Sequence, residues 1–156
     1  MPEGGKVINP WSRTAARESP FRPGPPSTLV LMSEPQSARS ARLFVRQYSA
    51  YHLAGASEEH VETVALVACE LVTNAIRYGT EPGDSLRMML DADGDRTRVE
   101  VHDPVRHHPR RRCPSDERER GRGLLLLDAL CPQRWGVSDI PFGKAVWAEV
   151  AVRPCW

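Results

Sequence analysis

The chain has 156 residues and a formal net charge of +1, from 21 basic and 20 acidic side chains. This length fits one domain, and the balanced charge argues against a surface built wholly for nucleic acid or anionic membrane. The longest apolar run, residues 64–69, is far short of the roughly 20 residues that a membrane-spanning helix needs. No secretory signal pattern is recognisable, and the four cysteines are widely spaced. We therefore expect a cytoplasmic protein with free thiols.

Residues 1–28 hold six of the 14 prolines and few apolar side chains. Such a segment cannot bury enough surface to offset the entropy of ordering it, which predicts a disordered, Pro-rich N-terminal arm. Trp11 and Phe21 could be docking points for a partner, although stray aromatic residues in a tail are the commoner case. We expect the folded domain to span residues 29–156.

The first elements of this domain are a short strand over residues 28–32 and a helix that ends near His52. Ser33 is the expected N-cap of the helix, with Pro35 in the first turn and Gly55 after its end. The side chains expected to be buried, themselves or through their neighbours, are Leu43, Phe44, Tyr48 and Tyr51.

The second helix has the clearest pattern in the chain. Ser57 is its expected N-cap, with Glu58 and Glu59 favourably placed in the first turn, and Gly79 is its expected C-terminal stop. Apolar residues recur at steps of three and four at Val61, Val64, Ala65, Ala68, Leu71, Val72, Ala75 and Ile76.

Two strands follow, around residues 86–90 and 99–101, joined by a hairpin turn at Asp93-Gly94. The alternation of the second strand places Asp103 on the same face as Val99 and Val101. A carboxylate at the end of a core-facing row is unusual, because its burial requires a partner.

The last third of the chain begins with a long charged segment, residues 104–120, which predicts a lid or binding loop. Gly121-Arg122-Gly123 then precedes an apolar helix over residues 124–131. A closing hairpin is expected from residues 135–140 and 144–152. The basic run 106–112 could contact nucleic acid, but acidic residues follow at once and no aromatic residue interleaves for base stacking.

Three motifs could carry chemistry. Glu70 and Asn74 are four residues apart and share one helix face, where Asn can ligate Mg²⁺ and Glu can accept a proton. Asp103 could accept a hydrogen bond from an exocyclic amine such as that of adenine. The segment 121–123 could offer backbone N–H groups to an anion. Taken singly, each is more often a solvated pair, a turn cap or a plain turn.

The order of these motifs resembles the GHKL ATPases, which share the Bergerat ATP-binding fold. More narrowly, it resembles the small anti-sigma-factor serine/threonine kinases of high-GC Gram-positive bacteria. The matching segments are residues 70–79, 99–103, 121–124 and 143–149. The resemblance implies a two-layer α/β (α+β) sandwich, the histidine kinase-like ATPase fold, with helices on one face of a mixed, mostly antiparallel sheet.

The resemblance also implies roles for these residues, with ATP and Mg²⁺ as cofactors. Asn74 would hold the Mg²⁺, Glu70 would be the general base, and Asp103 would bind the adenine amine. The residues that would contact the phosphates are Gly121, Arg122, Gly123 and Leu124. Phosphoryl transfer depends mostly on positioning and charge neutralisation, so these few groups could suffice.

The expected function is therefore an ATP-binding regulator that phosphorylates a small antagonist protein on serine. Its expected partners are a sigma factor or that antagonist, with a homodimer also possible. The alternative is a non-catalytic, nucleotide-gated binding module. Two departures from the family pattern favour this alternative: Pro104-Val105 follows Asp103 in place of a glycine-containing segment, and Ala145 stands where a Thr is usual.

Overall fold

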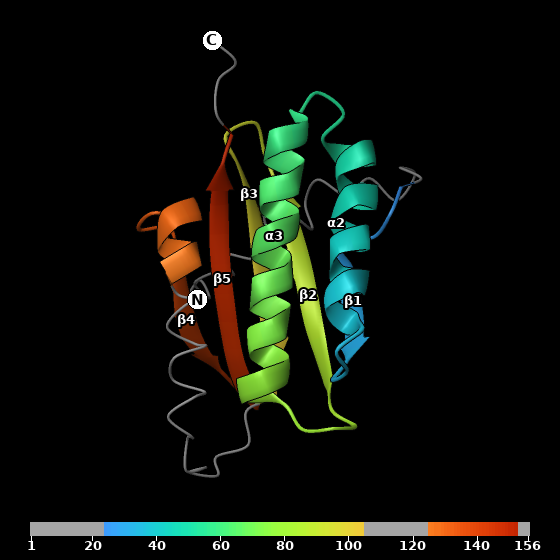
Figure 1. Cartoon of the computed structure of the whole chain (residues 1–156), viewed down its shortest axis with the longest axis vertical. Helices are drawn as coiled ribbons and strands as arrows, with labels where there is room; N and C mark the ends of the chain where they lie inside the picture. Colours follow the sequence, from blue (N-terminus) through green and yellow to red (C-terminus); the bar gives the residue numbers. More distant parts are fainter. Residues whose placement is uncertain (1–23, 105–124, 153–156) are drawn as a thin grey trace, which may run out of the picture.

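A computed structural model describes residues 24–104 and 125–152 of the chain (Figure 1). Three α-helices, a π-helical turn and five strands make up this part. The helical elements are α2 (Ser37–His52), α3 (Glu58–Asn74) and η1 (Ala75–Gly79), and residues 125–130 are also helical. The strands are β1 (Thr28–Met32), β2 (Ser85–Ala92), β3 (Arg96–Asp103), β4 (Trp135–Ile140) and β5 (Gly143–Ala151).

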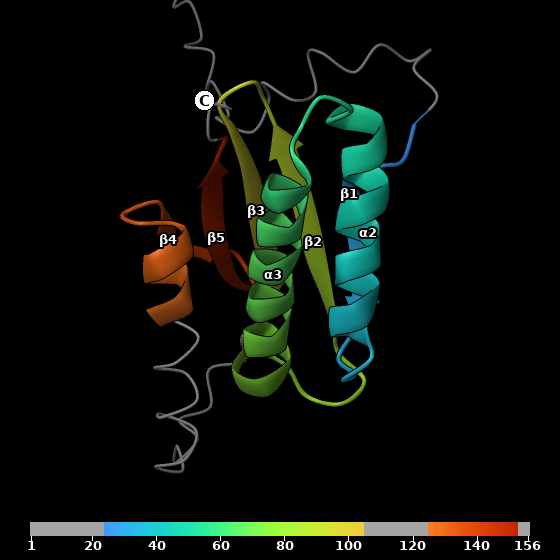
Figure 2. The same cartoon turned by 45° about the horizontal axis from the view of Figure 1, so that its top comes forward.

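The five strands form one sheet in the order β1-β2-β3-β5-β4, and all four described pairings are antiparallel. Figures 1 and 2 show α2 and α3 side by side over the same face of this sheet, with α2 over β1 and β2 and α3 over β3 and β5. The predicted two-layer sandwich with helices on one face and a mostly antiparallel sheet is confirmed.

The core lies between these two layers. From α3 it takes six buried residues, two of which are alanines that let the helix approach the sheet closely. From the central strands it takes Met88, Leu90, Val99 and Val101, which alternate with residues on the opposite face. The residues contributed by α3 are Val64, Ala65, Val67, Ala68, Leu71 and Val72.

For the first helix, the expected N-cap is wrong and the expected set of buried residues is right in part. Helix α2 has Gln36 as its N-cap, not Ser33, because residues 33–36 form a turn in which Ser37 donates its backbone N–H to the carbonyl of Glu34. Leu43 and Tyr51 are 50% and 48% exposed, whereas Phe44, Val45 and Tyr48 are buried. The buried face of α2 therefore includes Phe44 and Tyr48, as predicted, but it includes Val45 and not Leu43 or Tyr51.

The second helix begins as predicted. The Ser57 side chain accepts a hydrogen bond from the backbone N–H of His60, and Glu58 and Glu59 occupy the first turn. The regular α-helix ends at Asn74, and the predicted stop at Gly79 is the last residue of the π-helical turn. The hairpin at Asp93 is also confirmed, since its carboxylate accepts the N–H groups of Asp95 and Arg96.

The sheet face away from the helices carries a network of charged side chains. Arg98 contacts both Glu100 and Glu149, at 3.4 and 3.0 Å, and its guanidinium lies over the ring of Trp147. His102 contacts Glu100 at 2.6 Å. Glu100 is only 3% exposed, so this network buries a carboxylate on a face that no described helix covers.

Several predicted features lie outside the described residues. These are residues 1–23 of the predicted arm, all of the predicted lid except Pro104, and the four predicted phosphate contacts Gly121, Arg122, Gly123 and Leu124. Within residues 24–104 and 125–152, no helix is both long and apolar enough to cross a membrane.

Candidate functional site

The second half of α3 presents the predicted polar pair. Glu70 and Asn74 are both partly buried, and each borders the buried residues Leu71 and Val72. Side chains four residues apart on a helix have Cβ atoms about 5–6 Å from each other, so the two polar groups are neighbours on one face. Asn74 is also the last residue of the regular helix, directly before the π-helical turn.

The π-helical turn η1 connects this pair to the sheet. A π-turn at the end of an α-helix is rare and is often found at functional sites. Thr80 fixes its end, because the Thr80 hydroxyl lies 3.1 and 3.2 Å from the carbonyl oxygens of Ala75 and Ile76. The same hydroxyl is 2.6 Å from that of Ser33, the residue expected to cap α2. The turn is therefore held against the end of β1.

Asp103 closes the core-facing row of β3. Its side chain is fully buried, and it follows Val99 and Val101 on the face covered by the helices, as the alternation predicts. Lys144 is its cross-strand partner on β5, and the Lys144 ammonium lies 3.7 Å from a carboxylate oxygen of Asp103. This ion pair offsets part of the cost of placing a carboxylate in the core.

Two glycines approach Asp103 too closely to carry a side chain. A Cβ at Gly79 would overlap the Asp103 carboxylate, and a Cβ at Gly143 would overlap its backbone carbonyl oxygen. The end of η1 is thus in direct contact with the end of β3. As a result, the structure brings Glu70 and Asn74, through one helical turn, to the same end of the molecule as Asp103 (Figure 1).

Sequence reasoning missed the contacts that Lys144 and Thr80 make at this site. Lys144 was placed in the last strand, but its pairing with Asp103 depends on the register between β3 and β5, which are separated by a long segment of chain. Thr80 directly follows Gly79, where the helix was expected to stop. A hydroxyl at that position could have indicated a hydrogen bond to the last carbonyl groups of the helix.

Another buried polar group lies at the opposite end of α3. The Nε2 atom of His60 is 2.9 Å from the hydroxyl of Thr97, and both side chains are buried. Burial lowers the pKa of His60 below its ordinary value of 6.5, opposed in part by a backbone hydrogen bond with Ala151. This histidine therefore joins the start of α3 to the sheet in its neutral form.

Of the cysteines in the described part of the chain, Cys69 is partly buried and Cys131 is buried, and both are free. Burial, with a smaller contribution from Glu149, raises the pKa of the Cys131 thiol to about 11. Such a thiol is inert at neutral pH, so Cys131 is a core residue and not a candidate nucleophile.

Two comparisons with known proteins bear on the family and the fold. Residues 31–133 match the family model of the histidine kinase-like ATPase domain. This match covers well over half of the chain, and the chain belongs to that family. It includes Glu70, Asn74 and Asp103, together with the segment 121–124.

Among solved structures, the chain is similar to the RsbU and RsbW domains of Rv1364c from Mycobacterium tuberculosis, with a TM-score of 0.54 and 20% identity. The similarity covers 81% of this chain and 33% of that one, so the chain spans about a third of the length of its structural neighbour. Identity this low shows a common fold. No curated protein sequence matches the chain.

The described residues fit a nucleotide of the family's kind. The buried Asp103 carboxylate supplies an acceptor for an amine, and Asn74 supplies a neutral oxygen that suits Mg²⁺. Gly79 packs directly against this carboxylate, and a side chain at residue 79 would displace it. Glu70 supplies a carboxylate one helical turn from Asn74.

Proposed function

We propose that the chain binds Mg²⁺-ATP between α3, η1 and the end of β3. The observation that carries this proposal is the buried carboxylate of Asp103 beside Gly79, which suits the exocyclic amine of adenine. Asn74 would hold Mg²⁺, which neutralises phosphate charge when bound. The segment 121–124 would donate backbone N–H groups to the phosphates, as its sequence predicts.

We further propose that the chain is a serine/threonine protein kinase of the anti-sigma type. In this reaction a serine hydroxyl oxygen of a small antagonist protein bonds to the γ-phosphorus, and the bond to ADP breaks. Glu70 would accept the serine proton. Family membership and the similarity of fold to a structure containing an RsbW domain support this proposal. A sigma factor is the second proposed partner.

Nucleotide binding is tested by thermal unfolding with and without Mg²⁺-ATP and Mg²⁺-ADP. A ligand at 100 times its dissociation constant adds about 2.7 kcal/mol of stability, which is readily visible as a rise in Tm. The rise is expected for the unaltered chain and for Asp139→Ala, an exposed aspartate on β4. It is expected to vanish for Asp103→Ala, each variant being compared with its own ligand-free Tm. The absence of any rise at millimolar nucleotide would refute the proposed site.

Catalysis is tested separately with Glu70→Gln. This variant is expected to keep the nucleotide-dependent rise in Tm and to lose transfer of labelled phosphate to the protein substrate. Glu62→Gln, two turns earlier on α3, is the matched control and should retain transfer. Unchanged transfer by Glu70→Gln would exclude this residue as the base.

A non-catalytic, nucleotide-gated binding module is the second candidate. It is favoured by Pro104, which directly follows Asp103 where the family pattern has a glycine-containing segment, and by the buried Ala145 on β5, where a Thr is usual. In that case Glu70→Gln leaves control of the partner intact, whereas Asn74→Ala weakens it through the loss of a Mg²⁺ ligand. A homodimer is also proposed, and sedimentation of the full chain tests it.

A further inference from the structure

A lysine accompanies the proposed adenine acceptor on the face of the sheet that the helices cover. Lys144 on β5 is the cross-strand partner of Asp103, and its ammonium nitrogen lies 3.7 Å from a carboxylate oxygen of Asp103. On its other side, Lys144 is paired in register with Asp139 of β4. Within residues 24–104 and 125–152, the ammonium makes an ion pair with Asp103 and none with Asp139. The lysine is therefore directed toward the proposed nucleotide site.

The two charges of this ion pair differ in their access to solvent. The Asp103 side chain is fully buried, whereas the Lys144 side chain is 21% exposed. Because the charged atoms are only 3.7 Å apart, any group that bonds to this carboxylate oxygen lies within reach of the ammonium. A base that binds Asp103 therefore also meets Lys144.

Lys144 has hydrogen-bonding capacity to offer a ligand. A lysine ammonium carries three N–H donors and no acceptor, and a carboxylate accepts at both oxygens. The distance of 3.7 Å to Asp103 is longer than the usual length of about 2.7–2.9 Å for a hydrogen bond between charged groups. Among the described residues the ammonium makes no hydrogen bond. The site thus presents an acceptor with a donor directly beside it.

An acceptor beside a donor matches one edge of adenine. The exocyclic amine of adenine donates, and the adjacent nitrogen of its six-membered ring only accepts. Proteins that bind a single base read this edge through hydrogen bonds. Guanine presents the reverse order on the same edge, with a carbonyl oxygen in place of the amine and an N–H in place of the acceptor. The order of Asp103 and Lys144 therefore favours adenine.

We infer that Lys144 is a specificity-determining residue, which donates a hydrogen bond to this ring nitrogen while Asp103 accepts from the amine. The inference rests on the proposed function, since it concerns the same nucleotide site. Hydrogen bonds with an ionised donor are roughly twice as strong as those between neutral groups. A site built to bond a polar atom strongly rejects a ligand that lacks this atom, because a buried polar group is left unpaired.

Titration of the full chain with Mg²⁺-ATP and with the Mg²⁺ complex of 1-deaza-ATP, in which C–H replaces this ring nitrogen, tests the inference. The unaltered chain is expected to bind the analogue at least about tenfold more weakly than ATP. Lys144→Met, which removes the donors, should bind ATP about tenfold more weakly and should show no further loss with the analogue. A variant that still binds ATP tenfold more tightly than the analogue would overturn the inference, because Lys144 would then only hold Asp103 in place.

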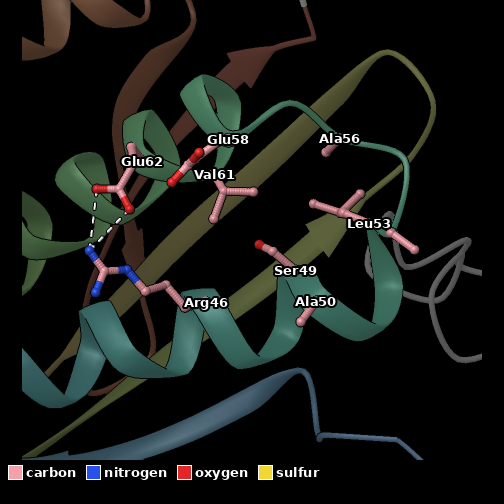
Figure 3. Close-up of a pocket in the computed structure, with 9 residues that line it drawn as sticks. Arg46, Ser49, Ala50, Leu53, Ala56, Glu58, Val61 and Glu62 are labelled. Carbon is pink, nitrogen blue, oxygen red and sulfur yellow. Dashed lines mark hydrogen bonds and ion pairs between the residues drawn. The ribbon is translucent and has the colours of Figure 1, made fainter.

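Arg46→Met is the matched control for Lys144→Met. Arg46 is also a cation engaged by a carboxylate, since one guanidinium nitrogen lies 3.0 Å from Glu62 (Figure 3). Both side chains line a pocket between α2 and the first half of α3, whereas Asp103 contacts Gly79 beyond the other end of α3. The control variant removes one positive charge in the same way and should bind both nucleotides as the unaltered chain does.

The remaining outcomes separate this inference from the proposed function. If the unaltered chain binds no Mg²⁺-ATP, the proposed site and the inference are overturned together. If it binds ATP and the analogue equally well, the site stands and the inference is overturned. That comparison needs no variant, so it decides the question even where Lys144→Met fails to fold. Binding of Mg²⁺-GTP as tight as that of Mg²⁺-ATP would also overturn the inference, because guanine reverses the order of donor and acceptor.

Discussion

The contact between Gly79 and Asp103 leaves no room for a side chain at residue 79. Because the carboxylate lies in the core, it cannot retreat without disturbing β3. We expect Gly79→Ala to lower the free energy of unfolding by about 1–3 kcal/mol, the usual cost of overpacking, and to remove the rise in Tm with Mg²⁺-ATP. Denaturant unfolding and thermal shifts measure the two effects. Gly94→Ala is the control, since a Cβ there meets nothing within 4 Å. Equal losses in the two variants would contradict this reasoning.

His60 makes the stability of the domain sensitive to pH. Burial lowers the pKa of its side chain below 6.5, so the unfolded chain binds the proton more readily than the folded chain. The stabilisation is complete above about pH 6.5 and is lost as the pH falls below that value, with a slope of at most about 1.4 kcal/mol per pH unit.

The free energy of unfolding between pH 5 and pH 7 measures this contribution of His60. His60→Gln keeps a hydrogen-bonding group near Thr97 but cannot titrate. Its unfolding free energy should therefore fall less steeply over this range than that of the unaltered chain. Parallel curves for the two chains would mean that another group causes the pH dependence.

At the scale of single elements, the sequence predicted those helices, caps and turns that are determined by residues close together in the chain. The second helix, its Ser57 cap and the hairpin at Asp93 are fixed by neighbours within a few residues, and each is confirmed. The burial of Asp103 followed from the period of two in β3. Ser33 failed as a cap because its hydroxyl contacts Thr80, which is 47 residues away.

The parts of the site that could not be predicted depend on pairing between distant elements. Lys144 meets Asp103 only because β5 inserts between β3 and β4 in one particular register. The approach of Gly79 to Asp103 likewise requires the π-helical turn, for which the apolar spacing of α3 gives no sign. Such contacts depend on tertiary packing, which local propensity does not encode.

The π-helical turn itself is expected to depend on Thr80. Thr80→Val keeps the shape of the side chain but removes the hydroxyl that contacts Ala75, Ile76 and Ser33. Loss of these buried hydrogen bonds should lower the free energy of unfolding by about 1–3 kcal/mol and weaken Mg²⁺-ATP binding through Gly79.

Thr63→Val is the matched control for Thr80→Val. Its hydroxyl donates to the carbonyl of Glu59 within α3 at an exposed position. Denaturant unfolding and nucleotide titration of both variants test the role of the turn. If Thr80→Val loses stability but keeps its nucleotide affinity, the π-helical turn does not contribute to nucleotide binding.

At the scale of the whole molecule, the two sides of the sheet are stabilised differently. The helices supply apolar side chains to one side, and the core forms there. The other side has no described helix, and on that side the central strand β3 carries Arg98, Glu100 and His102 in one row. Trp147 on β5 lies opposite Glu100 with the Arg98 guanidinium over its ring, and Gly136 on β4 leaves the ring close room, since a Cβ there would lie 3.1 Å from it.

The buried part of this charged network should contribute far more to stability than the exposed ion pairs of the helices. Glu100 is 3% exposed and contacts both Arg98 and His102, whereas Glu62 pairs with Arg46 while its side chain is 53% exposed. Replacing the buried carboxylate removes one of the two carboxylates that Arg98 contacts and the hydrogen-bond partner of His102, so Glu100→Gln is expected to cost about 1–3 kcal/mol.

Glu62→Gln is expected to cost about 0.5 kcal/mol or less, because an exposed ion pair is screened by water and salt. Urea unfolding of both variants in 0.05 M and 1 M NaCl measures the contrast. The small loss in Glu62→Gln should disappear at high salt, and the loss in Glu100→Gln should persist, since salt screens a buried pair much less. If both losses disappear together, the open face of the sheet is solvated and Glu100 acts as a surface charge.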